Sequence, residues 1–205
     1  VLEFRYGQQR RPRPRKTWGV FPHRLVDKRH PLVNDVNTRF DVPHSRWNDV
    51  SRSQFDAARL RVLAESDVGV HLATSPDGFR FVFFQGHPEY DTISLLKEYK
   101  REVMRYRDGE LVDYPPFVEN YFRVRNKAIL REYRGRLEEA LASGSDAPVF
   151  PDELLTCGLD NTWRDTAHAV VGNWVGLVYQ LTHRDRRRPF MDGIDPENPL
   201  GLPEP

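Results

Sequence analysis

Apolar and polar residues alternate through much of the first half of the chain, as they do in half-buried strands. The alternation is clearest in the two segments that precede Asp77-Gly78, a favourable hairpin turn. Earlier in the chain, we expect a strand that continues into a loop, with Pro43, His44 and Ser45 at its exit. The strands predicted in this way cover residues 19–26, 39–50, 58–66, 68–75 and 79–86.

Three longer segments instead repeat their apolar residues every three or four positions, which is typical of amphipathic helices. They span residues 92–110, 124–144 and 162–185, and a loop is expected over residues 143–153. In the first of these helices, Gly109 lies just past the last apolar position, where a glycine favours the end of a helix. The apolar side of this helix consists of Ile93, Leu96, Tyr99, Val103 and Tyr106.

The N-terminal residues are typical of the last turns of a helix, which Gly7 closes. Leu2, Tyr6 and Phe4 would form its apolar side. Because a domain rarely begins inside a helix, we expect the chain to be the C-terminal portion of a longer protein. The Pro- and Arg-rich segment 8–19 then predicts an extended, solvated linker, and a cationic rim for phosphates or a carboxylate is the alternative.

The composition disfavours several classes of partner. Thirty-one basic and 30 acidic side chains give a formal charge of +1, so no global field attracts nucleic acid or an anionic membrane. The basic residues of segment 10–16 have one aromatic neighbour, Trp18, and no recognition motif around them. No run approaches the ~18 apolar residues of a membrane span. A single cysteine excludes an internal disulfide and fits a cytoplasmic protein.

A histidine and a carboxylate directly follow the apolar run of residues 79–86, with Pro88 between them. His87 becomes an effective general base if a carboxylate such as Glu89 bonds one ring nitrogen, because that bond fixes the tautomer and stabilises the imidazolium. A loop after a strand is also where α/β folds place their sites. The spacing thus predicts a base and its orienting acid, and a solvated histidine beside a turn is the alternative.

Other chemistries find less support in the sequence. The seven histidines lack paired metal-ligand spacing, and no phosphate-binding glycine loop is present, so no metal is expected. Cys157 lies far along the chain from His87, without a helix N-terminus or elbow turn to lower its pKa, and we expect it to be a bystander. Strands alternate with helices only in part, so the predicted fold class is α/β.

The motif GHPEYD, with GVFPHRL and PHSR before it and EYKREV in the helix after it, resembles the homoserine O-acyltransferase family. The resemblance runs from residue 1 to about residue 107 and resumes near residues 161–182. It implies a class I glutamine-amidotransferase-like (flavodoxin-like) three-layer sandwich whose N-terminal part is absent from this chain. It also implies a single acyltransferase domain, of which residues 1–205 are the C-terminal part, with an insertion around 108–160 that could cover the site or contact a subunit.

That family uses a Cys-His-Glu triad to pass an acyl group from succinyl-CoA or acetyl-CoA, through a cysteine thioester, to the hydroxyl of L-homoserine in methionine biosynthesis. By resemblance, His87 is the base and Glu89 is its orienting acid. Lys16, Ser45 and Arg101 match positions that contact substrate. An arginine can hold a carboxylate by two parallel hydrogen bonds, which a lysine does not reproduce. Acyl-CoA is then a co-substrate, and no bound cofactor is expected.

The resemblance places the cysteine about two helical turns upstream of residue 1, so we expect these residues alone to lack the nucleophile. It leaves open the acyl donor and the acceptor, which could be another hydroxy amino acid such as serine. A glutamine-amidotransferase-like hydrolase, which shares the triad, and a non-catalytic homologue are the alternatives. The partners expected are these small molecules, with no nucleic acid and no membrane, and a homodimer is left open.

Overall fold

The structure of the chain is a computed structural model that describes residues 1–203. These residues form two compact units. The first comprises Val1–Thr17, Phe21–Glu89 and the chain from Thr162 onward, and the second comprises Trp18–Val20 and Tyr90–Asn161. None of the helices described for residues 1–203 is both long and apolar enough to cross a membrane.

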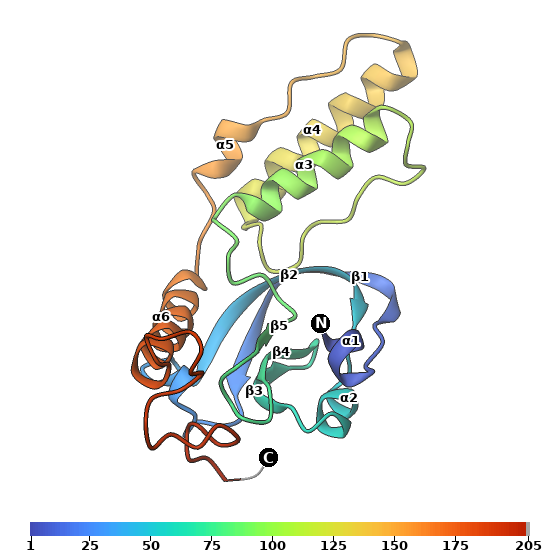
Figure 1. Cartoon of the computed structure of the whole chain (residues 1–205). Helices are drawn as coiled ribbons and strands as arrows, with labels where there is room; N and C mark the ends of the chain where they lie inside the picture. Colours follow the sequence, from blue (N-terminus) through green and yellow to red (C-terminus); the bar gives the residue numbers. More distant parts are fainter. Residues whose placement is uncertain (204–205) are drawn as a thin grey trace. The chain divides into compact units, whose positions relative to one another are not determined.

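A five-stranded sheet in the order β2-β1-β3-β4-β5 organises the first unit (Figure 1). The pairs β1–β3, β3–β4 and β4–β5 are antiparallel, and the register joins Val62 to Ala73 and Leu72 to Phe84. The predicted α/β class is confirmed as a mixed fold with a curled antiparallel sheet, whereas the three-layer sandwich stays a prediction. The strands are β1 (Arg11–Leu25), β2 (Arg39–Asp49), β3 (Arg61–Ser66), β4 (Gly69–Thr74) and β5 (Val82–Phe84).

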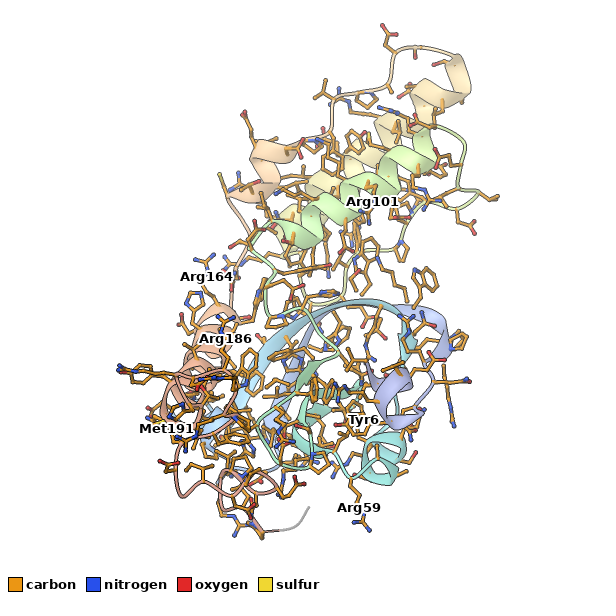
Figure 2. The ribbon with its side chains drawn as sticks, in the orientation of Figure 1. Tyr6, Arg59, Arg101, Arg164, Arg186 and Met191 are labelled. Carbon is orange, nitrogen blue, oxygen red and sulfur yellow. The ribbon has the colours of Figure 1, made fainter. Side chains whose placement is uncertain are left out.

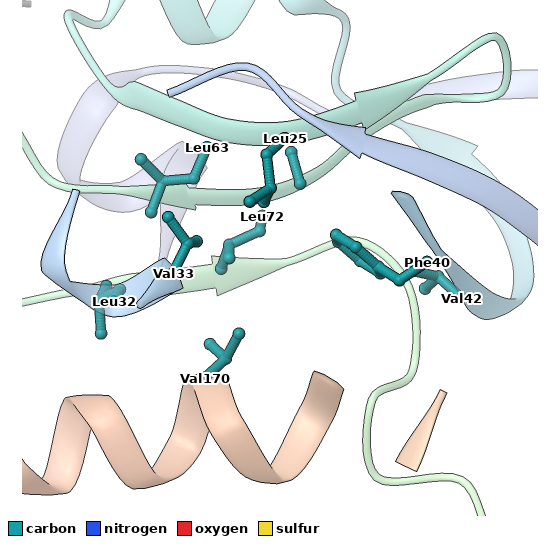
Figure 3. Close-up of a cluster of buried hydrophobic side chains, with 9 residues drawn as sticks. Leu25, Leu32, Val33, Phe40, Val42, Leu63, Leu72 and Val170 are labelled. Atoms are coloured by element: carbon teal, nitrogen blue, oxygen red, sulfur yellow. The ribbon is translucent and has the colours of Figure 1, made fainter. Parts of the chain in front are cut away.

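Neighbouring residues of β3 face two different apolar cores, as the alternation in the sequence predicts. Leu63 belongs to a core that Val170 of helix α6 (Arg164–Leu181) completes (Figure 3). Val62 belongs to a second core with Phe55 of helix α2 (Arg52–Ala57). Leu2 and Tyr6 of helix α1 (Leu2–Tyr6) pack against this second core. The first core also contains Leu25, Leu32, Val33, Phe40, Val42, Ala64 and Leu72.

The short elements of the first unit begin and end where their capping residues lie. Gly7, with φ 65°, closes α1 in the left-handed conformation that glycine adopts without strain. The Gln54 side chain accepts a hydrogen bond from the Ser51 backbone N–H at 3.1 Å, which is half of a capping box at the start of α2. The 3-10 helix η1 (Pro31–Val33) begins at His30, whose Nδ1 accepts from Leu32 N–H at 3.2 Å.

The second unit contains three helices, α3 (Ser94–Arg107), α4 (Val124–Ser143) and α5 (Asp152–Thr156). Tyr99 and Val103 of α3 are fully buried, as the helical spacing predicts. Lys100 forms an ion pair with Asp152 at 2.5 Å, which joins α3 to α5. The Tyr121 hydroxyl donates to the Thr92 carbonyl at 2.6 Å and accepts from the Leu96 N–H at 3.2 Å, so it satisfies two backbone groups at the start of α3.

The three long helices are confirmed, with ends that lie zero to four residues inside the predicted ones. The prediction of a linker over residues 8–19 is wrong, because β1 begins at Arg11. Pro12 and Pro14 are two positions apart, so the N–H groups they lack point to the same side of the strand, and the other side can still pair. Arg13 bonds Asp49 at 3.1 Å, which fixes this end of β1.

Three smaller expectations are also wrong. Residues 43–45 do not lie at the exit of a strand but within β2, where Pro43 and His44 are buried. The strand expected over residues 79–86 is shorter in the structure, where β5 covers Val82–Phe84 alone, because Phe79 and Phe81 belong to the turn around Asp77. Phe4 is 92% exposed, so the apolar side of α1 consists of Leu2 and Tyr6 alone.

Candidate active site

The loop that carries His87 is fixed by backbone hydrogen bonds to two strands. The N–H of Gln85 donates to the carbonyl of His71 on β4 at 2.9 Å. The N–H of His87 donates to the carbonyl of Pro43 on β2 at 2.8 Å. Because main-chain atoms make both bonds, they join the loop directly to the backbone of the sheet.

Gly86 lies in close contact with buried side chains between these two bonds. A Cβ atom added at this position would lie 2.4 Å from Val42 Cγ1, 3.0 Å from His44 Nε2 and 3.0 Å from His71 Nδ1. These distances are well inside the ordinary carbon contact of about 3.5–4.0 Å. The glycine of the GHPEYD motif therefore lets the main chain approach the core closely just before the histidine.

His87 and Glu89 form the predicted pair. His87 Nδ1 lies 2.8 Å from Glu89 Oε1. Because a carboxylate only accepts hydrogen bonds, Nδ1 carries the proton, and Nε2 is the nitrogen that would exchange a proton with a reacting group. The His87 side chain is 32% exposed and the Glu89 side chain 66%, so solvent reaches both. This arrangement is that of a base with an orienting acid, although its catalytic role stays a prediction.

A cavity of about 810 Å³ adjoins His87 and is lined only by residues of the first unit. The structure brings Ser45, one of the predicted substrate contacts, into this cavity together with His87. Arg10, Arg46 and Gln85 add polar groups to a lining that is otherwise partly apolar. The volume falls within the range of small-molecule sites, about 300–1,000 Å³.

Arg46 forms a polar network beside this cavity that sequence reasoning missed. Its side chain is only 9% exposed, donates to Asp49, and reaches Gln85 Oε1 at 3.3 Å and the Val68 carbonyl at 2.5 Å. Burial lowers the pKa of Arg46 below its ordinary value, and the neighbouring Asp49 carboxylate offsets part of that shift. Arg13 also bonds Asp49, at 3.1 Å. The arginine that follows the serine of PHSR was the available signal.

Three further histidines, His23, His44 and His71, lie buried close to the loop and were also missed. Burial lowers the pKa of His23 to about 4 and holds those of His44 and His71 well below the ordinary value, so all three are neutral at neutral pH. The predicted strands 19–26 and 68–75 already contain His23 and His71, whereas His44 was expected at the exit of a strand.

The other two predicted substrate contacts belong to β1 and to α3. Lys16 lies half-buried on β1, where its role stays a prediction. Arg101 belongs to α3 in the second unit, where its side chain is 64% exposed and lies 3.7 Å from Glu102 (Figure 2). Cys157 is exposed at the end of α5 in that same unit.

Comparison with known proteins gives the family. The family model for homoserine O-succinyltransferase matches residues 1–184. Homoserine O-succinyltransferase from Allochromatium vinosum is 62% identical over 203 residues, which cover 98% of this chain and 57% of that protein. The proteins of the same name from Nitrosococcus oceani and Thiobacillus denitrificans are 58% and 60% identical, over 100% and 98% of this chain and 58% and 56% of theirs.

The chain thus spans between half and two thirds of the length of these relatives. Within that span the similarity is nearly continuous, and it includes the loop with His87 and Glu89, since the family match reaches residue 184. The chain belongs to the homoserine O-succinyltransferase family.

Proposed function

We propose that the protein transfers a succinyl group from succinyl-CoA to the hydroxyl of L-homoserine. The observation that supports this most directly is the 2.8 Å bond from His87 Nδ1 to Glu89, at the edge of a cavity large enough for a small substrate. The names of the relatives favour succinyl over acetyl and homoserine over serine. The same resemblance supports a glutamine-amidotransferase-like fold and a cytoplasmic role in methionine biosynthesis.

The first half-reaction would acylate a cysteine, which the resemblance places upstream of residue 1. His87 Nε2 would take the proton of the thiol, and the thiolate would attack the carbonyl carbon of succinyl-CoA. A new carbon–sulfur bond forms, the bond to the sulfur of coenzyme A breaks, and His87 returns the proton to that leaving sulfur. Backbone N–H groups would hold the oxyanion that develops on the carbonyl.

The second half-reaction would pass the succinyl group to homoserine. His87 Nε2 would take the proton of the homoserine hydroxyl, whose oxygen attacks the thioester carbon and displaces the cysteine sulfur. The proton then returns from His87 to that sulfur, so the enzyme is restored. Glu89 would stabilise the imidazolium in both steps through its bond to Nδ1.

The substrate contacts rest on the resemblance together with one feature of the site. Ser45 lines the same cavity as His87, so its hydroxyl could bond the polar end of a substrate. We assign to Arg101 a two-pronged contact with a carboxylate and to Lys16 a single charged contact. Acyl-CoA would be a co-substrate and not a bound cofactor.

The proposal is tested by measuring acyl transfer with the complete gene product. We expect succinyl-CoA and homoserine to react, with serine as acceptor and acetyl-CoA as donor much slower. His87→Ala should lower kcat by about 10²–10⁴-fold, whereas His168→Ala, on an exposed position of α6, should not. Full activity in His87→Ala, or release of ammonia from glutamine in place of acyl transfer, would overturn the proposal.

A further inference from the structure

Three imidazoles from three strands form a buried cluster in the first unit. His23 of β1, His44 of β2 and His71 of β4 have exposed fractions of 3%, 0% and 4%. The rings of His23 and His44 stack at 5.0 Å with an interplanar angle of 12°. His71 meets both rings edge-on, at 5.4 Å and 6.1 Å. We call these three residues the histidine cluster.

The hydrogen bonds of the cluster define its tautomers. His23 Nδ1 lies 2.8 Å from the Phe21 carbonyl oxygen, which can only accept a hydrogen bond. Nδ1 therefore carries the proton of the neutral ring, and Nε2 bears a lone pair that can accept. That lone pair faces two donors, His44 Nε2 at 3.3 Å and the Ser66 hydroxyl at 3.0 Å. His44 therefore carries its proton on Nε2, and its Nδ1 has no hydrogen-bond partner among residues 1–203.

The cluster supports the loop that carries the candidate base. Gly86 packs against His44 Nε2 and His71 Nδ1, as the 3.0 Å distances from its ideal Cβ position show. The residues on either side of Gly86 bond the main chain of the same two strands, Gln85 at His71 itself and His87 at the neighbour of His44. Contacts with the side chain of His44, and with the side chain and carbonyl of His71, thus set the position of His87.

We propose that His44 and His71, together with His23, are positioning residues that hold the Gly86–His87 turn in the orientation that lets Nδ1 of His87 bond Glu89. The proposal rests on His87 acting as the base in the proposed function. The cluster itself would touch neither substrate nor the reacting atoms.

Imidazoles suit this role better than aliphatic side chains would. Their flat rings stack, and their edges present a ring nitrogen in place of a methyl group where Gly86 comes close. Among residues 1–203, no group of three or more His, Cys, Asp or Glu side chains is arranged to hold a metal ion, so the cluster is not a metal site. The working state of the cluster is therefore three neutral rings in contact, with a hydrogen bond between His23 and His44.

The first test observes His87 without substrate. Nitrogen-15 NMR of the histidine side chains, in the complete gene product, should show His87 as a single Nδ1–H tautomer. In His44→Ala and His71→Ala we expect averaged tautomers, because the bond to Glu89 is no longer held. His30→Ala is the matched control, since His30 is equally buried but caps η1 and packs near Gly78. Signals of His87 that change no more than in His30→Ala would overturn the proposal.

A pair of conservative variants keeps the test informative if the alanine variants do not fold. The amide nitrogen of His44→Gln can occupy the place of Nε2 and donate to His23, whereas that of His44→Asn corresponds to Nδ1. If the cluster positions His87, His44→Gln should retain the single Nδ1–H tautomer of His87, whereas His44→Asn should not. Equal signals in the two variants would contradict it.

The second test is kinetic and separates the two proposals. We expect His71→Ala and His44→Asn to lower kcat by roughly 10–100-fold while KM changes little, because the base is displaced but substrate contacts remain. If the wild type transfers succinyl and these variants behave like His30→Ala, positioning fails and the proposed function stands. If the wild type transfers nothing while the NMR changes occur as expected, the proposed function fails and the positioning of His87 stands.

Discussion

Replacement of Gly86 by alanine should damage activity far more than stability. The added Cβ would lie 2.4 Å from Val42 Cγ1, so these atoms must separate by about 1 Å to reach ordinary contact. Overpacking of this kind costs ~1–3 kcal/mol, and the lower entropy of the unfolded chain returns ~0.4–1 kcal/mol. We therefore expect a net loss of ~1–2 kcal/mol in the free energy of unfolding.

The effect on the rate follows from where that movement occurs. Gly86 directly precedes His87, whose N–H bonds the Pro43 carbonyl at 2.8 Å, so a shift of the glycine is passed to the base. A misplacement of about 1 Å can cost about 100-fold in rate. Urea unfolding and the rate of succinyl transfer from succinyl-CoA to homoserine measure the two effects in the same preparation.

Two further variants control for the substitution itself. Gly172→Ala makes the same change within α6, where no atom of residues 1–203 beyond the neighbouring helix backbone lies within 4 Å of the new Cβ, so it should add ~0.5–1 kcal/mol of stability and leave the rate unchanged. Val42→Ala combined with Gly86→Ala removes the closest clash and should recover part of the rate. Wild-type rate and stability in Gly86→Ala alone would refute the reasoning.

Three more predictions concern pH, the second unit and substrate binding. Burial lowers the pKa of His30 to about 4, below its ordinary 6.5, so the unfolded chain binds the extra proton as pH falls from 6.5 to 4 and stability is lost over that window. His30→Asn keeps the cap of η1 but removes the titration, so urea unfolding should show a pH-dependent loss smaller by roughly 3 kcal/mol. Tyr121→Phe, which leaves two backbone groups at the start of α3 unbonded, should cost ~1–3 kcal/mol in the free energy of unfolding. Arg101→Lys should raise KM for homoserine by about 10-fold with kcat little changed, since lysine cannot make the two-pronged contact.

Each of these predictions has a control and a contrary result. A pH dependence of unfolding in His30→Asn as steep as in the wild type would show that His30 is not the titrating group. Tyr179→Phe removes the same hydroxyl from a side chain that is 80% exposed and should leave the free energy of unfolding unchanged. Arg107→Lys makes the conservative change of Arg101→Lys elsewhere on α3, and an equal rise in KM in both variants would remove the assignment of Arg101.

The long helices could be predicted from the sequence because their stabilisation is local and periodic. Tyr99 and Val103 are buried in α3 at the spacing that the pattern requires, and Gly144 closes α4 with φ 69°. The strands were harder, since β1 is held by pairing with distant segments. The prolines of its first residues indicated a linker, while the bond from Arg13 to Asp49 could not be seen in a single segment.

The candidate site was predictable only where its residues are close in sequence. His87 and Glu89 are two positions apart, so their bond could be inferred from the motif and is found at 2.8 Å. The histidine cluster draws one side chain from each of three strands, and its members become neighbours only when the sheet forms. The contact of Gly86 with two of them depends on the register of β2 and β4, which no local pattern specifies.

The intact mass of the complete gene product, after separate incubation with succinyl-CoA and acetyl-CoA, tests the central claim most directly. The account predicts a gain of one succinyl group from succinyl-CoA, its discharge by homoserine, and no gain in His87→Ala. The absence of an adduct from succinyl-CoA, or an adduct that forms equally well in His87→Ala, would contradict it.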